Sequence, residues 1–502
     1  MSDIFKHGVY GQIQAISSRV PNAGRSAIVY IGTAPVHTLA LESGESYNVN
    51  KPVVVNNISE ARQLFGYSDD WASYTLCEAM HAHLENNGVG PLVLINVLDP
   101  TKTAHKGTAG TVSKTPENGR IIIPSAESII LDSVVVKTQD DTPVVKVKGT
   151  DYSIAYSIEK KTITITELSA GALGTAALTI TYDVINPAGV TSADVIGSSD
   201  GLGLNTGTFA VQNVYPLTGY IPSFLAAPGF SSIPDVHTAM YQNSQKINDH
   251  WDAYMFVDLP LINGATVLNL NTVVTYKNAN GYDKPNETVY FPMALGTDGA
   301  YYHLSVLAAA NFQGLLIEQD DVPYKTASNT DCPIIERLYI SASDTERVYD
   351  DAIINAKLNK NGIASAAFVG GRWAIWGASS ADYNQNDGDR INVAETNRMM
   401  LFYISNDFQH RRSPDVDQPM TANDLQTIVA EEQSRLDALT KMGALLYGEV
   451  FIDVSARARS DIMNGDYAFS FNVTTTPLAK SMTAIVNWTD AGFTTYFESL
   501  TA

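Results

Sequence analysis

Cysteine is almost absent from this sequence. The 502 residues include two, Cys77 and Cys332, which lie far apart in unrelated surroundings. So low a count cannot build a disulfide framework and is typical of proteins kept in a reducing compartment. The sequence also lacks C-x-x-C and H-E-x-x-H motifs. We therefore expect both cysteines to be small core residues, and we expect no metal and no cofactor.

Basic residues and long apolar runs are also scarce. Lysine and arginine number 32 against 53 aspartates and glutamates, which gives a net charge of -21. This balance opposes general binding to nucleic acid or to anionic lipid. No apolar run approaches the ~20 residues that cross a bilayer, and the opening MSDIFKHGVYGQ has no secretory signal pattern. We expect a soluble protein, made in a cytoplasm, that binds no nucleic acid directly and inserts into no membrane.

What the sequence does contain is an alternation of strand and helix patterns. SAIVYIGTAP and PLVLINVLDP predict buried strands; between them lie a strand, a short helix capped by Ser59, and the helical WASYTLCEAMHAHLENNG. A similar alternation follows Tyr215. We therefore expect residues 23–100 and 215–362 to form one central α/β body, whose sheet is covered by helices.

Between residues 101 and 214 the composition changes. Runs such as IIIPSAESIILDSVVV and KKTITITEL are rich in strand-forming residues, are separated by turn residues, and show scarcely any helical periodicity. This pattern predicts an inserted all-β domain. Because the α/β pattern resumes afterwards, the two ends of the insert should lie close together and the insert should project outward.

The last part of the chain predicts a helix followed by two alternating strands. One face of the helix 423–442 is apolar, and Thr421 with Asp424 fits a capping box. In GEVFIDVSA and DYAFSFNVTTTP every second residue is apolar, which selects Val450, Ile452, Val454, Tyr467, Phe469, Phe471 and Val473. We predict a C-terminal α+β domain over residues 363–480. The expected fold class is thus α+β and multidomain.

A sheet of two strands is marginal in water, so these strands need further partners. The terminal segments 1–22 and 481–502 are too short to fold alone, and both show the alternation of a strand. Either the last segment folds back onto its own sheet, or other chains complete the sheet by β-augmentation. The pattern alone leaves both possibilities open.

The best candidate for catalysis is GSSDG, residues 197–201, which fits G-x-S-x-G with Ser199 as the nucleophile. A nucleophile elbow needs a helix directly after the serine, and the following GLGLNTGT cannot start one. GLGLNTG likewise misses the spacing and the helix of a phosphate-binding loop. We interpret the whole stretch as a glycine loop, and a serine hydrolase at Ser199 is kept as the enzymatic alternative.

Three other groupings have simple structural interpretations. His81 and His83 point to different sides of a predicted helix, which favours a surface pair over a metal site. NQNDGDR, residues 384–390, lacks the closing glutamate of a calcium loop and predicts a polar turn. Trp373 and Trp376 lie among glycines and apolar residues, which favours buried packing over stacking on a sugar or base. No catalytic constellation emerges, so we expect a protein that is not an enzyme.

Several segments, taken in order, resemble the contractile tail sheath family of phages, phage-tail-like bacteriocins and related injection machines. They are HGVYGQIQ, SAIVYIGTAP, NKPVVVNN, YDVINPAGVTSADVIGSSDG, FLAAPGFSSIPDV, MFVDLP, GIASAAFVGGRWAIWGASSADY, DVDQPMTANDLQTIVAEEQSRLDALTKMGALLYGEVFID and RSDIMNGDYAFSFNVTTTPLAKSMTAIVNW. The resemblance covers most of the chain and is weakest over residues 101–180. The chain departs from many members after WG, where it lacks an Arg-Thr pair, and before GVY, where it lacks a proline.

The resemblance implies a structural subunit that polymerises helically around an inner tube and contracts to drive that tube through a target cell envelope, without nucleotide hydrolysis. The implied partners are further copies of the chain, the inner tail tube protein, and the baseplate and tail terminator proteins. The implied location is the tail of a virion or tail-like particle that is assembled in a bacterial cytoplasm.

The resemblance also implies that arms of two neighbouring subunits add strands to the C-terminal domain of a third. The host strands would be the two alternating strands above, and the donors would include Val9, Tyr10, Ile13, Ile485, Val486, Trp488 and Tyr496. In the family the C-terminal domain lines the lumen, so Lys441, Arg457 and Arg459 are candidates for contact with an acidic tube. Solvated surface charge is the simpler alternative for these three. An adhesive or shell-forming β protein, suggested by the insert, is the second alternative function.

Overall fold

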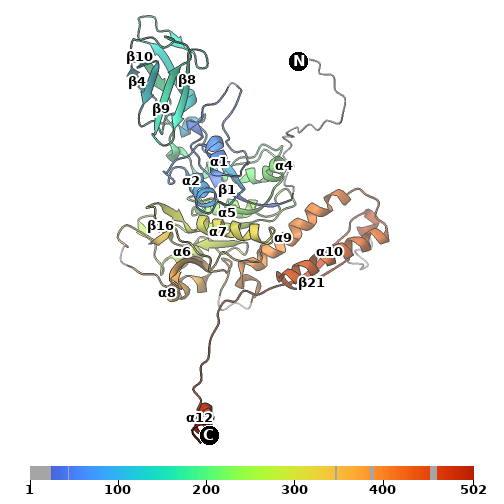
Figure 1. Ribbon diagram of the computed structural model, residues 1–502. Helices are drawn as coiled ribbons and strands as arrows, with labels where there is room; N and C mark the ends of the chain where they lie inside the picture. Colours follow the sequence, from blue (N-terminus) through green and yellow to red (C-terminus); the bar gives the residue numbers. More distant parts are fainter. Residues whose placement is uncertain (1–23, 43, 345–346, 385–388, 453–460, 502) are drawn as a thin grey trace, which may run out of the picture. The chain divides into compact units, whose positions relative to one another are not determined.

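The computed structural model describes residues 24–42, 44–344, 347–384, 389–452 and 461–501. The chain forms two compact units, which divide between Pro419 and Met420. We call residues 24–419 the body and residues 420–501 the C-terminal unit. Figure 1 shows both, with some of their helices and strands labelled.

The body is built on a mixed sheet of eight strands. Their order across the sheet is β2 (Val53–Val55), β3 (Leu92–Asn96), β1 (Ser26–Gly32), β11 (Ile221–Ala226), β12 (Tyr254–Asp258), β15 (Glu287–Tyr290), β19 (Ile363–Val369) and β20 (Arg372–Trp376). The six central strands are parallel, and β2 and β20 are antiparallel to their neighbours. Strands β3, β11, β12 and β15 are buried along their whole length, as expected of parallel strands covered on both faces.

Helices between the strands cover this sheet. They are α1 (Ile58–Phe65), α2 (Thr75–Met80) with the π-helical η2 (His81–Asn86), α3 (Ser192–Ile196), α4 (Val214–Thr218), α5 (Pro234–Asn243), α6 (Val273–Ala279), α7 (Leu304–Glu318), α8 (Asp351–Lys357) and α9 (Glu395–Arg412). A three-stranded sheet, β17 (Tyr301–His303), β16 (Met293–Gly296) and β18 (Ile335–Tyr339), and the hairpin β13 (Ile262–Asn263) and β14 (Thr266–Val267) complete the body's regular strands outside the insert. The cap of α1 differs from the prediction: Asn57, not Ser59, accepts the hydrogen bond from the amide of Glu60, because the helix begins at Ile58.

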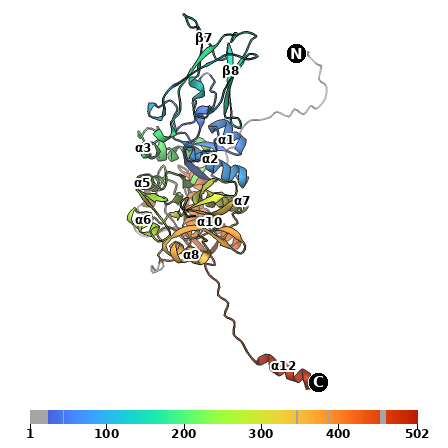
Figure 2. The same cartoon turned by 90° about the vertical axis from the view of Figure 1, so that its left-hand side faces the viewer.

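A β-rich insert lies between β3 and β11. One of its sheets has the order β4 (Gly110–Lys114), β10 (Leu178–Tyr182), β6 (Val135–Thr138) and β7 (Val145–Lys146). The other has the order β5 (Arg120–Ile123), β9 (Thr162–Glu167) and β8 (Tyr152–Ser157). The insert has a hydrophobic core separate from that of the body, formed by residues between Ile121 and Ile180. Figure 2 labels one strand of each sheet, β7 and β8.

The insert starts and ends at one place. The amide of Gly107 donates to the carbonyl of Val184 at 2.7 Å, and the amide of Asn186 donates to the carbonyl of His105 at 2.7 Å. Beyond these bonds the chain returns to the body, because Val195, in α3, is buried in the body core. The separate core is therefore shorter than the predicted insert 101–214.

The end of the body also differs from the predicted boundary. The predicted C-terminal domain begins at residue 363, but β19 begins there and pairs in parallel with β15, with Ile363 opposite Val289. Ala366, Ala367 and Ile375 are buried in the body core. Strands this apolar need a sheet that is already covered, so residues 363–376 complete the body instead of opening a new domain.

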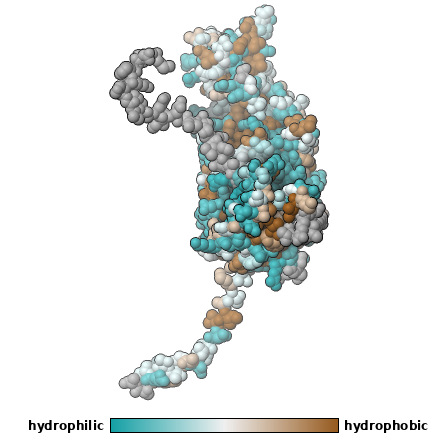
Figure 3. All heavy atoms as spheres, turned by 90° about the vertical axis from the view of Figure 1, so that its right-hand side faces the viewer, coloured by the Kyte–Doolittle hydropathy of each residue, from teal (hydrophilic) through white to brown (hydrophobic). Residues whose placement is uncertain are grey.

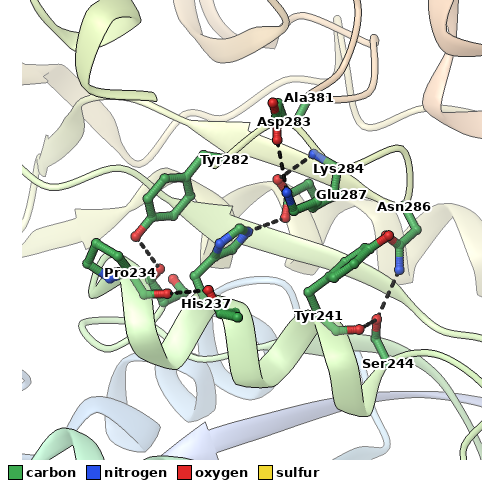
Figure 4. A network of polar contacts seen from close by, with 12 residues as sticks. Pro234, His237, Tyr241, Ser244, Tyr282, Asp283, Lys284, Asn286, Glu287 and Ala381 are labelled. Atoms are coloured by element: carbon green, nitrogen blue, oxygen red, sulfur yellow. Dashed lines mark hydrogen bonds and ion pairs between the residues drawn. The ribbon is translucent and has the colours of Figure 1, made fainter. Parts of the chain in front are cut away.

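A buried polar network ties α5 to β15, and Figure 4 shows its side chains. His237 Nε2 lies 2.5 Å from Glu287 Oε2, and both side chains are buried. The other carboxylate oxygen, Oε1, accepts a hydrogen bond from the amide of Lys284 at 3.1 Å. The backbone carbonyl of Glu287 accepts one from the amide of Ala381 at 2.8 Å. A buried carboxylate is costly without such partners, so the network fixes how helix and strand pack.

Candidate inter-subunit interface

The loop of Ser199 does not have the geometry of a nucleophile elbow. It follows the short helix α3 and leads into the 3-10 helix η6 (Gly207–Asn213). The hydroxyl of Ser199 accepts a hydrogen bond from the amide of Gly201 at 3.2 Å, and Ser199 pairs with Asn205 in a small bridge. The serine thus takes part in a turn and is not presented between a strand and a helix N-terminus, as the G-x-S-x-G nucleophile elbow requires.

The two histidines of the H-x-H pair lie in different surroundings. His81 is close to Tyr67 and Glu85 near the surface. His83 is buried, and its ring nitrogens lie 2.7 Å from the hydroxyl of Tyr30 and 2.6 Å from Oε1 of Gln313. Burial lowers the pKa of His83 to about 4, although the bond to Gln313 opposes this shift. The prediction of a surface pair is therefore wrong for His83, which is a core residue.

The remaining groupings concern metal binding, the polar stretch 384–390 and the two tryptophans. Over the described ranges, no group of three or more histidine, cysteine, aspartate or glutamate side chains could hold a metal ion. Residues 385–388 of the polar stretch NQNDGDR lie outside the described residues. Trp373 and Trp376 are half-buried against the body core, and their indole nitrogens donate to the carbonyl of Glu336 and to Oδ1 of Asn355. Among the helices that the structure describes, none is long and apolar enough to cross a membrane.

The C-terminal unit begins with the helix α10 (Ala422–Met442). The hydroxyl of Thr421 accepts from the amide of Asp424, and the Asp424 carboxylate accepts from the amide of Thr421, so the predicted capping box is confirmed. The helix ends at Gly443, which has a left-handed φ of 88°. This conformation suits glycine and turns the chain directly into a strand.

Two antiparallel strands follow, β21 (Leu445–Ile452) and β22 (Phe469–Thr475). Val450 lies opposite Phe471, and Ile452 lies opposite Phe469. These residues share the sheet face that packs on α10, since a Cβ on Gly448 would lie 2.9 Å from Cβ of Leu436 and Val450 is buried. The other face keeps Tyr447 and Phe451 exposed. Among the described residues this sheet has two strands, so no segment of the described C-terminal tail joins it as a third.

The edge of β21 that faces away from β22 is occupied by a side chain. Nε2 of Gln433 donates to the carbonyl of Gly448 at 3.0 Å, and Oε1 of Gln433 accepts from the amide of Val450 at 3.1 Å. Nε2 also donates to Oδ1 of Asp437 at 2.9 Å. Gln433 was not among the interface residues predicted from the sequence. The available signal was a polar residue within the apolar stripe of the helix, between Val429 and Leu436.

The C-terminal tail leaves large apolar side chains in water. Residues 479–500 are all exposed, including Ile485 at 82%, Val486 at 90% and Trp488 at 82%. The helix α12 (Ala491–Thr501) carries Phe493, Tyr496, Phe497 and Leu500, all exposed and spaced i, i+3, i+4, i+7. Figure 3 shows hydrophobic side chains on the segment that leads to this helix. Such a stripe is typical of a helix that packs into a partner's groove.

The body fixes the point at which residues 1–23 join it. The amide of Gly24 donates to the carbonyl of Gly219 at 3.1 Å, and Gly24 has a φ of 88°. A Cβ at this position would lie 2.1 Å from Cδ2 of His410. The left-handed φ and this close approach both favour glycine, so close packing between α4 and α9 fixes the backbone conformation at Gly24.

The predicted interface residues divide into three groups. Val450, Ile452, Phe469, Phe471 and Val473 lie in the two paired strands, and Tyr467 lies two residues before β22. Ile485, Val486, Trp488 and Tyr496 are exposed, with Tyr496 in a helix where a strand was predicted, and Lys441 lies in the last turn of α10. Val9, Tyr10, Ile13, Val454, Arg457 and Arg459 lie outside the described residues.

No protein-family model matches this sequence. The tail sheath protein of Burkholderia phage BcepMu is 27% identical to it over 268 residues. The aligned region covers 52% of this chain and 50% of that protein, so the chain aligns with about half the length of this curated relative.

Solved structures resemble the chain over nearly its full length. A chain in the baseplate structure of the anti-feeding prophage has a TM-score of 0.53 at 13% identity, covering 97% of this chain and 99% of that chain. A chain of the contracted sheath complex of an extracellular contractile injection system, PVC, has a TM-score of 0.53 at 12% identity, covering 98% and 99%. The sheath tail protein of Desulfitobacterium hafniense has a TM-score of 0.50 at 11% identity, covering 93% and 100%. The resemblance predicted from the sequence is thus confirmed: this chain is similar in sequence to a curated tail sheath protein and has the mixed α/β fold of contractile sheath proteins.

Proposed function

We propose that this chain is the sheath subunit of a contractile tail or tail-like particle, which polymerises helically around an inner tube and contracts without nucleotide hydrolysis. Two features together carry the proposal: the C-terminal tail is exposed, and the sheet of the C-terminal unit has only two described strands. Fully burying one large apolar side chain contributes about 1.5–3 kcal/mol, so a tail with this many in water favours association. The sheath fold and the curated relative supply the kind of assembly.

Exchange of the terminal arms would link the subunits. Residues 482–488 of one copy would add as a strand to the two-stranded sheet of another, and α12 would place its apolar stripe against that same copy. The N-terminal segment, which enters the body at Gly24, would link to a further copy. Links of this kind let rigid bodies rotate and slide while the lattice stays connected.

Contraction then requires a source of work other than a nucleotide. New surface buried between neighbouring bodies would supply it, and the extended state would be held by a kinetic barrier until a baseplate releases it. The partners are therefore further copies, an inner tube protein, baseplate proteins and a tail terminator. We place the subunit in a particle tail assembled in a bacterial cytoplasm, and we assign it no enzymatic activity.

Electron microscopy of the purified chain at increasing concentration tests this function. We expect striated hollow tubes from the full chain and none from chains that lack residues 1–18 or residues 479–502. Discrete shells or monodisperse particles from the full chain, also in the presence of an inner tube, would contradict the proposal. Labelling by a fluorophosphonate probe would instead favour the hydrolase alternative at Ser199.

Contact with the tube would use the C-terminal unit. Lys441 is exposed in the last turn of α10, and Arg457 and Arg459 follow β21 in the sequence. We expect that replacing both arginines by glutamate stops assembly templated by a tube while the chain still folds. Normal templated assembly of this double variant would mean that these charges are simply solvated.

A further inference from the structure

The side chain of Gln433 stands where the backbone of a neighbouring strand would lie. A strand that joins a sheet edge donates its N–H to a carbonyl of that edge and accepts from an amide of that edge. The Gln433 amide does both, to the carbonyl of Gly448 and from the amide of Val450. The amide of Val450 donates to Gln433 and is therefore not used in the ladder with β22. Backbone groups of successive residues in a strand point to opposite edges, so the carbonyl of Gly448, two residues earlier, points to the same outer edge.

We propose that this outer edge of β21, at Gly448 and Val450, is the acceptor site for a strand of a second copy, and that Gln433 closes the edge until that strand arrives. The inference rests on the proposed function, since it names where an exchanged arm binds. An uncovered edge is a template for indiscriminate strand pairing. A side-chain amide covers it with two hydrogen bonds and leaves it available to a partner with more bonds to offer.

Displacement of Gln433 is inexpensive because its amide has another partner. Nε2 already donates to Oδ1 of Asp437, one turn further along α10. An incoming strand would replace the bonds to β21, and Gln433 would keep the bond to Asp437. Oε1 of Gln433 would lose the amide of Val450, but the side chain is only half-buried, so water can replace that bond and the cost of the exchange stays small.

The occupant is a second copy because the chain carries its own candidate donor strands. Residues 482–488 are exposed and contain Met482, Ile485, Val486 and Trp488. They do not pair with the chain's own sheet, whose described strands are β21 and β22. A strand from a second copy would hydrogen-bond to the backbone groups at the β21 edge. The same step would cover these apolar side chains.

The test compares the full chain with two variants in α10. Gln433→Met keeps the length of the side chain but removes both hydrogen bonds to the edge. Gln426→Met is the matched control, because Gln426 lies two turns earlier on the same helix and is exposed. Each dilute protein is titrated with synthetic peptides of residues 479–502 and 1–22, and hydrogen exchange is followed at the amide of Val450.

We expect Gln433→Met to bind one of the two peptides about tenfold more tightly than the native chain and the Gln426→Met control, because no competing bonds must be broken. In the free variant the Val450 amide should exchange faster, and the bound peptide should slow it again. The proposal is wrong if all three proteins bind alike, or if no peptide protects Val450. Because the measurement uses dilute subunits, these outcomes are distinct from a failure of the full chain to form tubes, which would contradict the proposed function itself.

Discussion

The body buries large apolar side chains that the tail of the C-terminal unit leaves exposed. Trp71 of the body is 8% exposed, whereas Trp488 of the C-terminal tail is 82% exposed. The body closes its sheet with helices and buries whole strands. The C-terminal unit has one long helix, a sheet of two described strands, and a tail whose residues 479–500 are all exposed. The body is a finished structure, whereas we propose that strands from other copies complete the C-terminal unit.

The largest expected contrast comes from equivalent truncations in the two units. The ring of Phe256 is fully buried and contacts the rings of Phe224, Phe312 and Tyr290. Phe256→Ala should destabilise the body by about 3–5 kcal/mol. Trp488→Ala should leave the unfolding of the body unchanged and weaken tube formation. Chemical denaturation with sedimentation of tubes measures both effects, and equal losses of body stability would remove the contrast.

Breaking the buried pair of the body should have the next largest effect. His237→Ala leaves Glu287 buried without the imidazole at 2.5 Å, and we expect a loss of about 3 kcal/mol. Lys246→Ala removes a surface ion pair with Asp252 and is the control, with a loss below about 0.5 kcal/mol. Denaturant titration of both variants measures how much unfolding free energy each one loses. Similar losses of stability in the two variants would show that burial adds little to what the network in Figure 4 contributes to stability.

Lowering the pH should destabilise the body but not the C-terminal unit. Burial lowers the pKa of both His37 and His83 to about 4, against about 6.5 in an unfolded chain, although hydrogen bonds to Glu127 and Gln313 oppose the shift. The unfolded chain therefore takes up these protons first as the pH falls. Stability is fully present above pH ~6.5 and declines toward pH ~4, by about 2 kcal/mol for each histidine at pH ~4.5.

The C-terminal unit offers an internal control for this acid sensitivity, because no histidine follows His410 in the sequence. Thermal unfolding from pH 7 to 4.5 should lower the midpoint of the body, and His83→Gln should flatten that slope. An unchanged slope in this variant would mean that the loss comes from groups other than His83.

The smallest effect is expected at the cap of α10. Thr421→Ala removes the hydroxyl that accepts from the amide of Asp424 and should destabilise the C-terminal unit by about 1 kcal/mol. Thr427→Ala, in the middle of the same helix, is the control. Its hydroxyl only donates back to the carbonyl of Asn423, so its loss should be close to zero. Helix content measured during thermal unfolding separates the two variants.

The sequence predicted these two units unevenly. The strand at Ser26, the helix after Thr421 and the alternation in Val450 and Phe471 could be predicted because each depends on local pattern and capping. The boundary at residue 363 could not, because whether an apolar strand joins the sheet before it or starts another is decided by long-range pairing with Val289. The burial of His83 depends in the same way on Gln313, which is distant in the sequence.

The two strands of the C-terminal unit were predicted, but the conformation of its tail was not. Period-two alternation identified β21 and β22, but it also extended a predicted strand to Tyr496, which lies in a helix. The spacing of Phe493, Tyr496, Phe497 and Leu500 fits a helix better than a strand once residues 491–501 are considered alone. The role of Gln433 could not be predicted from pattern, because it depends on which backbone groups of β21 point outward.

Because the insert is closed at its base, its sequence can change without altering the body. Two hydrogen bonds, between Gly107 and Val184 and between His105 and Asn186, join the outgoing and returning chain before the insert's own core begins. The body therefore receives the same paired ends whatever lies between them. Residues 108–183 form a cassette that could be exchanged for another domain with adjacent termini, and evolution or an engineer can change it without rebuilding the body.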